Sequence, residues 1–299
     1  MNKNSISNYF FHTKTINDNT KSVNSLIALT NNRIATCSND NTIRIYDTVN
    51  NFHCDDILAR HNTSIMSICQ LTDSTIVSCS TDNSLQIGDF LISNAHDSMI
   101  TKVIALPNNK IASCSHDKTI KIWKSIPPYS ETPLIVLHGH IEQVWSIIYI
   151  KERNVLISGS ESEDATIRIW NMSTYQCETV ITRIECTYSN ALYQIDSKRV
   201  IVGGYKQFII VNIDKCIIED IIDNLLVGYV RCFVRLNNRK RILCGCDQGK
   251  MCLYDIEDKT NIIIEDTQNR FRDINDILLL NNNIIACMSN GSITVWNNK

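Results

Sequence analysis

The sequence predicts an all-β protein built from seven copies of one small antiparallel sheet. The first observation is a short β-patterned segment that recurs as TIRIYD (42–47), SLQIGD (84–89), TIKIWK (119–124), TIRIWN (166–171), FIIVNID (208–214), KMCLYD (250–255) and SITVWN (292–297). The second is their spacing, because the segments end near residues 47, 89, 124, 171, 214, 255 and 297, in steps of 35 to 47 residues. A period of about forty residues carried by a β unit indicates a repeat architecture. The third is that no segment shows the apolar period of a helix.

The fourth unit, residues 138–181, shows how each copy is built. Its β-prone runs cover residues 144–150, 154–160, 166–171 and 176–181, and polar turn residues separate them. Four short strands joined by tight turns form an antiparallel meander. One such sheet cannot bury both of its faces, so we expect the seven copies to stack on one another.

Length and composition restrict the function classes. Seven units use nearly all of the 299 residues, so we expect a single domain, residues 1–299. A hydrophobic content of 43% is ample for its core, and a net charge of −2 leaves no basic surface for nucleic acid. No apolar run reaches the length needed to span a membrane. Neither nucleic acid nor a membrane is therefore an expected partner.

The cysteines follow the repeat. Cys37, Cys79, Cys114 and Cys287 hold one equivalent position, as small buried residues would. An odd total of 13, no signal peptide and no CxxC pair indicate a reducing compartment, which is the cytoplasm or, as an alternative, the nucleus. Cys244 and Cys246 have no second pair with which to bind zinc. We expect no metal and no cofactor.

Individual units also carry polar and aromatic residues at fixed places. Unit four opens with Gly139-His140, has Ser158 and Asp164 before its third strand, and ends that strand with Trp170. Unit three has the corresponding set His96, Ser113, Asp117 and Trp123, and unit two has His61, Ser78 and Asp82 with Gly88 in place of the tryptophan. These residues resemble the WD-repeat family of β-propellers. The resemblance covers all seven units unevenly, and unit five is recognised only by its strands and spacing.

The resemblance implies a single seven-bladed β-propeller and assigns a structural role to these residues. In the family they form a chain from Trp through Ser and His to Asp, which we expect in units three and four and in part in unit two. A Ser–His–Asp set also suggests a hydrolase. However, the set recurs in several units, and its serines lie inside strands between apolar neighbours, where no substrate would reach them. A buried indole N–H also needs an acceptor.

The ends of the chain predict how the ring closes. The chain stops at Lys299 after only three strands of unit seven, whereas a β-prone stretch, residues 8–16, precedes unit one. An open ring would leave an unpaired edge. We therefore expect residues 8–16 to supply the missing outer strand of the last sheet.

For function, the leading hypothesis is a non-catalytic scaffold that binds protein partners as one monomeric propeller within a hetero-complex. No nucleotide-binding, metalloprotease or dinucleotide fingerprint is present. Two alternatives stay open: an enzyme that uses the central opening, and a ubiquitin-ligase substrate receptor. The family's adaptor-docking Arg is absent after Asp47, Asp89, Asn171 and Asp255.

The resemblance also implies a partner-binding face, formed by the Gly-His loops and the turns before each aspartate. Trp145, Tyr229 and Arg231 are the preferred anchors, because hot spots favour these residue types. The other positions carried over from the family are Ser22, Asn24, Asn39, Ser64, Met66, Thr81, Met99, Thr101, His116, Gln143, Glu163, Thr187, Ser189, Asp273, Asn275 and Ser289.

Overall fold

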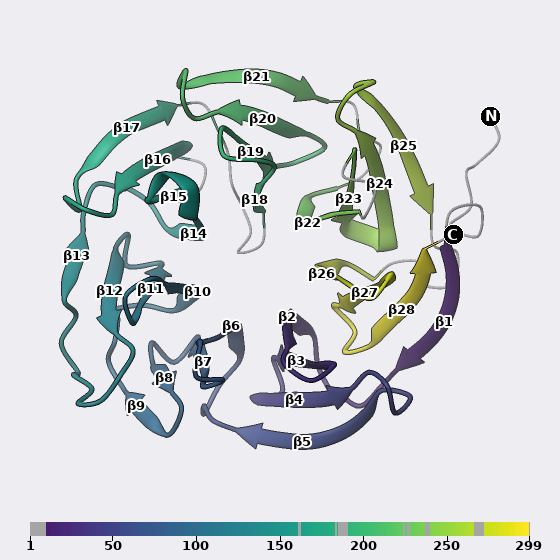
Figure 1. The fold of residues 1–299 in the computed structure, drawn as a ribbon, viewed down its shortest axis with the longest axis horizontal. Coiled ribbons are helices and arrows are strands. Elements are labelled where there is room, and N and C mark those ends of the chain that lie inside the picture. The colour runs from purple at the N-terminus through teal and green to yellow at the C-terminus, as the bar shows by residue number, and fades with distance from the viewer. Residues whose placement is uncertain are drawn as a thin grey trace.

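Seven four-stranded sheets stand around a central axis like the blades of a propeller (Figure 1). The structure, a computed structural model, describes residues 10–160, 163–182, 184, 191–223, 225, 228–236, 240–265 and 272–298, and the sheets are counted in these residues. Each sheet is antiparallel, and its first strand lies nearest the axis (Figure 1). The predicted seven-bladed all-β ring is confirmed.

In the first six blades the strands follow the chain order from the axis outward. The first four blades are β2 (Val23–Leu29), β3 (Arg33–Ser38), β4 (Thr42–Asp47) and β5 (His53–Ala59); β6 (Ile65–Gln70), β7 (Ile76–Ser80), β8 (Leu85–Ile87) and β9 (Phe90–Ile92); β10 (Ile100–Leu106), β11 (Lys110–Ser115), β12 (Ile120–Lys124) and β13 (Ile135–Leu137); and β14 (Val144–Ile150), β15 (Val155–Ser160), β16 (Thr166–Asn171) and β17 (Cys177–Thr182).

The last three blades include the one that closes the ring. They are β18 (Leu192–Gln194), β19 (Arg199–Gly203), β20 (Phe208–Asn212) and β21 (Ile217–Ile222); β22 (Val230–Arg235), β23 (Arg241–Cys246), β24 (Lys250–Asp255) and β25 (Thr260–Glu265); and β26 (Ile274–Leu280), β27 (Asn283–Met288), β28 (Ile293–Asn298) and β1 (Phe10–Ile16). The 3-10 helices are η2 (Lys151–Arg153), after β14, and η3 (Asp247–Gly249), after β23.

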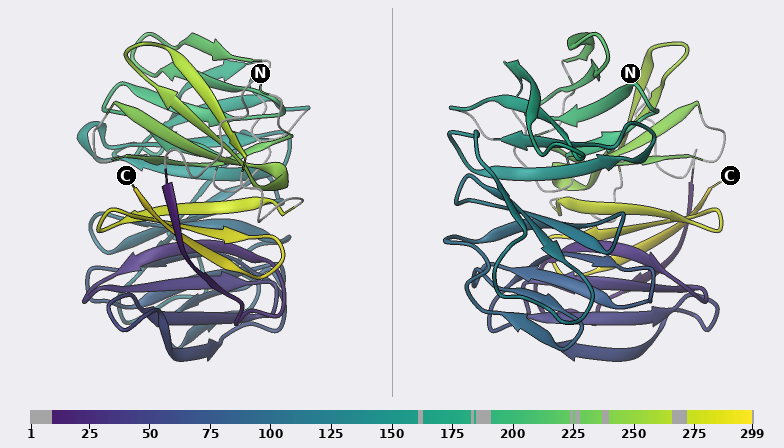
Figure 2. Two further views of the ribbon diagram at one scale, coloured as in Figure 1. Left: turned by 90° about the vertical axis from the view of Figure 1, so that its right-hand side faces the viewer. Right: turned by 60° about the vertical axis from the view of Figure 1, so that its left-hand side comes forward.

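The N-terminal strand closes the ring, as predicted. Strand β1 pairs antiparallel with β28, with Ile16 opposite Ile293 and Phe10 opposite Asn298. Both views in Figure 2 show the purple β1 beside the yellow β28. Residues 8 and 9 of the predicted closing stretch lie outside the described residues. The last blade is therefore built from both ends of the chain.

Blade five is regular although its sequence keeps little of the repeat pattern. Its four strands pair in the same order as those of the other blades. Gly203 lies where the blade approaches the next one, because a Cβ placed there would be 2.2 Å from the carbonyl oxygen of Val230. Spacing and β-branched runs thus suffice to form this blade.

The core lies between the blades. One apolar cluster, for example, joins Ala112 and Ile122 of blade three to Val144, Leu156 and Trp170 of blade four. The repeated cysteines 37, 79, 114 and 287 are fully buried in such clusters. All twelve cysteines in the described part of the chain are free, and burial raises the pKa of the Cys114 thiol to about 12. These thiols fill space and are not poised to react.

Candidate functional site

A β-bulge at the start of the inner strand positions the site. In six blades of the described ring, the register between the inner strand and its neighbour shifts after the first residue of the inner strand. A bulge turns a side chain away from the regular pleat. The residues at the bulges are Asn24, Met66, Thr101, Trp145, Arg231 and Asn275.

Five of the six bulge residues line one recess of about 240 Å³, the axial recess. Its lining residues are Ser22, Asn24, Asn39, Met66, Trp145, Arg231, Asn275 and Ser289. They come from blades one, two, four, six and seven, so the recess lies around the axis of the ring. All eight are among the positions that the family resemblance assigned to one face.

Thr101, the sixth bulge residue, does not reach this face. It is fully buried, and its Oγ1 donates to the carbonyl oxygen of Val144 at 2.7 Å. The expectation that Thr101 points onto the partner-binding face is therefore wrong, because its hydroxyl is used to join blades three and four. Asn275 Nδ2 likewise donates to Val23 O at 2.8 Å, but its side chain still borders the recess.

Two aromatic pairs lie among the residues of the predicted face. The rings of Trp145 and His116 are 4.5 Å apart and meet edge to face. Those of Tyr229 and Tyr205 are 5.0 Å apart, and Lys206 Nζ lies 5.0 Å from the centre of the Tyr205 ring. The sequence did not single out Tyr205, which is 51% exposed. An alignment of unit five with the other units would have identified Tyr205, because this residue occupies the position that aspartate holds in units two, three and four.

Arg231, one of the predicted anchors, already contacts carboxylates of its own chain. Its Nε lies 2.5 Å from Asp247 Oδ1, and its Nη2 lies 3.0 Å from Asp273 Oδ2. Its Nη1 donates to Asn275 Oδ1 at 3.2 Å. The guanidinium thus links blade six to blade seven and the loop before it. Reversing its charge by Arg231→Glu would place a third carboxylate beside those of Asp247 and Asp273 and should destabilise the fold.

Three further residues of the predicted face, Met99, Gln143 and Glu163, do not line the recess. Met99 and Gln143 are half-buried, and their carbonyl groups accept hydrogen bonds from His116 N and Ser160 Oγ. Glu163 is exposed in the turn before Asp164. Thr187 and Ser189 lie outside the described residues.

The polar sets of blades three and four form continuous hydrogen-bond chains. In blade three, Trp123 Nε1 donates to Ser113 Oγ at 2.8 Å, and this oxygen lies 2.7 Å from His96 Nε2. His96 Nδ1 lies 2.7 Å from Asp117 Oδ2. The carboxylate also accepts from the backbone N–H of Asp97, in the loop that enters the blade, at 3.1 Å.

Blade four repeats these contacts. Trp170 Nε1 donates to Ser158 Oγ at 2.8 Å, and Ser158 Oγ lies 2.6 Å from His140 Nε2. His140 Nδ1 lies 2.9 Å from Asp164 Oδ2. Ser158 is fully buried, as is Ser113. Neither hydroxyl can meet a substrate, so these sets join strands to the incoming loop and do not form nucleophiles.

The histidines of these chains are neutral. Burial lowers the pKa of His140 to about 4, although Asp164 acts in the opposite direction, and burial likewise lowers the pKa of His96. A neutral ring donates from Nδ1 to the carboxylate and accepts at Nε2 from the serine, whose oxygen accepts from the indole. Protonating Nε2 would leave the serine O–H without an acceptor. The hydrogen-bond chain therefore requires the uncharged imidazole.

Blade two keeps the histidine and serine but not the tryptophan. His61 Nε2 lies 2.8 Å from Ser78 Oγ, and His61 Nδ1 lies 2.7 Å from Ser84 Oγ. Ser84 Oγ in turn donates to Asp82, while His61 Nδ1 and Asp82 Oδ1 are 3.6 Å apart. A serine hydroxyl thus stands between histidine and aspartate. A hollow of about 350 Å³, lined in part by His61, Asp82 and Ser84, opens here.

Blades one and seven keep the aromatic residue and change its surroundings. In blade one, Tyr46 replaces the tryptophan, and Arg44 Nη1 donates to Asn19 Oδ1 at 2.7 Å and to Asp40 Oδ2 at 2.8 Å. In blade seven, Trp296 is 1% exposed, and its Nε1 has no hydrogen-bond partner among the described residues. Ala286 stands where blades three and four have serine.

Comparison with known proteins agrees with this architecture. Residues 10–47, 90–124 and 131–171 match the WD40 family, described as WD domain, G-beta repeat. These three stretches carry the WD repeat, and the chain folds as a β-propeller. Nuclear distribution protein nudF of Aspergillus niger is 35% identical over 89 residues, which cover 29% of this chain and only 19% of that relative. The crystal structure of the WD40 β-propeller domain of Doa1 matches with a TM-score of 0.77 over 97% of both chains, at 16% identity.

The propeller offers few groups for chemistry at its recess. Within the described residues, no group of three or more His, Cys, Asp and Glu side chains is arranged to hold a metal ion. In the same part of the chain, no helix is long and apolar enough to cross a bilayer. The recess combines amides, hydroxyls, a thioether, an indole and the guanidinium of Arg231, which are groups suited to contact and hydrogen bonding.

Proposed function

We propose that this WD-repeat propeller is a non-catalytic scaffold that binds protein partners through the face around the axial recess. The observation that carries the proposal is the convergence of five bulge residues from five blades on that recess. The bulges direct an indole and a thioether, Trp145 and Met66, into surroundings of asparagine and serine. Apolar anchors surrounded by polar groups are typical of protein interfaces.

The aromatic pairs extend this surface beyond the recess. Trp145 with His116 borders blades three and four, and Tyr229 with Tyr205 borders blades five and six. Both pairs are rigid and amphipathic, and such side chains lose little conformational freedom on binding. Trp145 and Tyr229 are accordingly the anchors of the proposal, with Met66, Met99, His116, Gln143 and Glu163 as surrounding contacts.

Arg231 has a different part in the proposal. Because its guanidinium already meets Asp247 and Asp273, it holds the floor and wall of the recess in shape. Arg231 therefore offers a partner a fixed surface, and its charge is already balanced by the two carboxylates. We further propose that the propeller acts as one subunit or adaptor of a larger complex in the cytoplasm or nucleus, where free buried thiols persist.

The test is recovery of the partner complex from the native source with tagged variants. Trp145→Ala combined with Tyr229→Ala should reduce recovery at least tenfold, since interface aromatics dominate binding free energy. The control is Lys151→Ala with Glu152→Ala in η2, which lies at the other end of β14 from Trp145. Both proteins should unfold in single transitions, which shows that the ring is intact.

The control variant shows which face of the propeller binds the partner. Loss of the complex in the Lys151 and Glu152 variant, with full recovery in the Trp145 and Tyr229 variant, would show that partners bind the opposite face. Full recovery in both would remove support for binding at either of these faces.

A further inference from the structure

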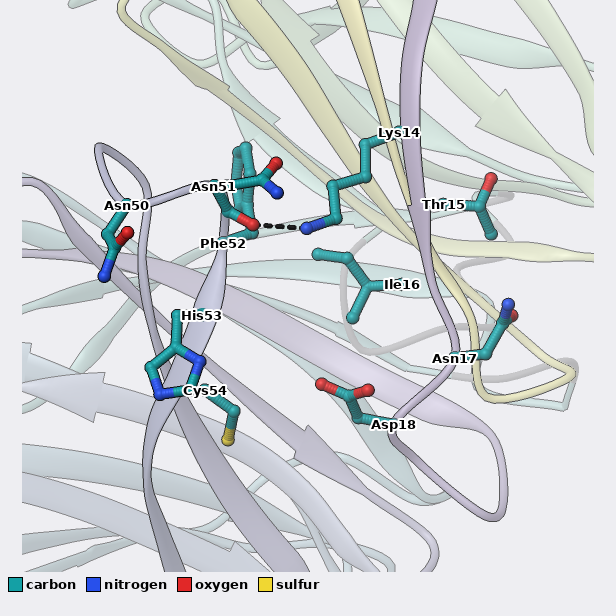
Figure 3. Close-up of a pocket in the computed structure, with 10 residues that line it drawn as sticks. All are labelled: Lys14, Thr15, Ile16, Asn17, Asp18, Asn50, Asn51, Phe52, His53 and Cys54. Carbon is teal, nitrogen blue, oxygen red and sulfur yellow. Dashed lines mark hydrogen bonds between the residues drawn. The ribbon is translucent and has the colours of Figure 1, made fainter.

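A second hollow lies where the ring closes, on the outside of the propeller and away from the axial recess. It measures about 660 Å³ and is bounded by residues 14–18 of blade seven's outer strand and its exit, and by residues 50–54 of blade one. Figure 3 shows the two segments facing each other across it. We call this hollow the seam groove. It is larger than the axial recess and belongs to none of the surfaces assigned above.

Along one side of the seam groove, every second side chain points into the groove. Lys14, Ile16 and Asp18 alternate along the chain and point into the groove, whereas Thr15 and Asn17 point away (Figure 3). This is the two-residue period of an extended chain. A cation, an apolar side chain and an anion therefore succeed one another along the groove.

The two ends of the groove differ in charge. At one end, Lys14 Nζ donates to the backbone carbonyl of Asn51, which uses one of its three N–H groups. At the other end, Asp18 is exposed and lies opposite Cys54 and His53 (Figure 3). Burial, and then the nearby Asp18 carboxylate, raise the pKa of the Cys54 thiol. The Asp18 end is thus acidic.

The floor between the charged ends is apolar. Ile16 is 4% exposed and belongs to the same apolar cluster as Tyr46, with Phe52 and Cys54 packed against it. A side chain placed over this floor would bury apolar surface between blades seven and one. The groove therefore offers one hydrophobic contact flanked by two opposite charges.

The backbone beside the groove is the edge of a sheet. Strand β1 is the outermost strand of blade seven, because it pairs with β28 on one side and ends the order of the sheet. An exposed edge is a template for an added strand. A strand added there would place alternate side chains beside Lys14, Ile16 and Asp18 and over the groove.

We propose that the seam groove binds an extended segment of a partner protein, added as a fifth strand along β1. At alternate positions this segment carries an acidic side chain for Lys14, an apolar side chain for the floor and a basic side chain for Asp18. Main-chain hydrogen bonds to β1 supply part of the affinity, and the two charges set the register. This interaction is separate from the axial recess and can fail or hold independently of it.

The test is selection of seven-residue peptides from a displayed random library on the whole chain. Peptides that carry an acidic, an apolar and a basic residue at alternate positions (acidic–x–apolar–x–basic), in this order or in the reverse order, should be enriched. Their amide hydrogen-exchange footprint should cover residues 10–18 and 50–54. Binding should fall at least fivefold in Asp18→Lys, because that change places two cations together.

The matched control is Asp56→Lys, an exposed carboxylate on β5 two residues beyond the groove lining. It should leave peptide binding unchanged, as should Trp145→Ala at the axial recess. Absence of enriched peptides with this pattern would overturn the proposal. So would equal losses in Asp18→Lys and Asp56→Lys, or a footprint at the axial recess.

Discussion

Blades three and four can be compared with blade two, which shares their His, Ser and Asp but ends its third strand differently. Where the first two have Trp123 and Trp170, blade two has Gly88, with φ of +56°. Its third and outer strands, β8 and β9, have three residues each. The aspartate side chain is 19% exposed in blade two, against 7% and 1% in blades three and four.

This difference separates two roles within one motif. The histidine and serine bond to each other in all three blades, so their contact does not need the indole. The indole adds a donor to the serine, and the aspartate is less exposed in the two blades that have it. Without it, a serine hydroxyl fills the gap between His61 and Asp82, and solvent reaches the hollow beside them.

The largest expected effect is acid destabilisation. An unfolded histidine titrates near 6.5, whereas His140 in the fold titrates at about 4. Between these values the unfolded chain binds a proton that the folded chain does not, so stability present above pH 6.5 is lost as the pH falls. His140 alone should cost on the order of 3 kcal/mol of unfolding free energy at pH 4 relative to pH 7.

The measurement is urea unfolding at a series of pH values. His140→Gln should be less stable at pH 7 and should show a shallower loss toward pH 4, because the titrating group is gone. Equal pH slopes for the wild type and His140→Gln would contradict the neutral, buried imidazole.

Removing the histidine should distinguish the two kinds of blade. His140→Ala should cost about 2–3 kcal/mol, because it leaves the buried partners Ser158 and Asp164 unpaired. His61→Ala should cost only about 1 kcal/mol, because Ser84 still donates to Asp82 and solvent can reach the hollow. Chemical denaturation at pH 7 measures both. Equal costs would show that the indole makes no difference to the histidine's contribution.

A smaller gain should follow from completing blade seven. Ala286→Ser would place a hydroxyl where blades three and four have one, within reach of the unpaired Trp296 Nε1. One buried hydrogen bond should raise the unfolding free energy by about 1 kcal/mol. The control is Ala112→Ser, next to the serine position in blade three. It introduces a buried hydroxyl into a cluster whose indole, Trp170, already donates to Ser158. Stabilisation by the control as well would show that the indole is not the cause.

The sequence predicted the ring and its closure because both rest on local signals. The period, the β-branched runs and the N-terminal stretch each indicate strands without reference to other blades. The chains of blades three and four were equally accessible, since His, Ser, Asp and Trp recur at fixed spacing. All eight residues of the axial recess were also named, because each holds an equivalent position in its unit.

What the sequence missed depends on contacts between distant segments. The role of Arg231 is set by Asp247 and Asp273, which come from two other loops. Thr101 is buried because blade four supplies an acceptor, the carbonyl of Val144. The seam groove exists only where residues 14–18 meet residues 50–54 across the ring closure. None of these juxtapositions has a spacing signal.

The central claim is that the His–Ser–Asp sets hold the fold while the surface around the axial recess binds partners. The most direct test compares two double variants, Ser113→Ala with Ser158→Ala and Trp145→Ala with Tyr229→Ala, for unfolding free energy and for recovery of the partner complex. The serine variant should lose several kcal/mol of unfolding free energy but should still recover the complex at a temperature at which it is folded. The aromatic variant should stay closer to the wild type in unfolding free energy and should lose the complex. Loss of the complex by the folded serine variant, with normal recovery by the aromatic variant, would contradict the claim.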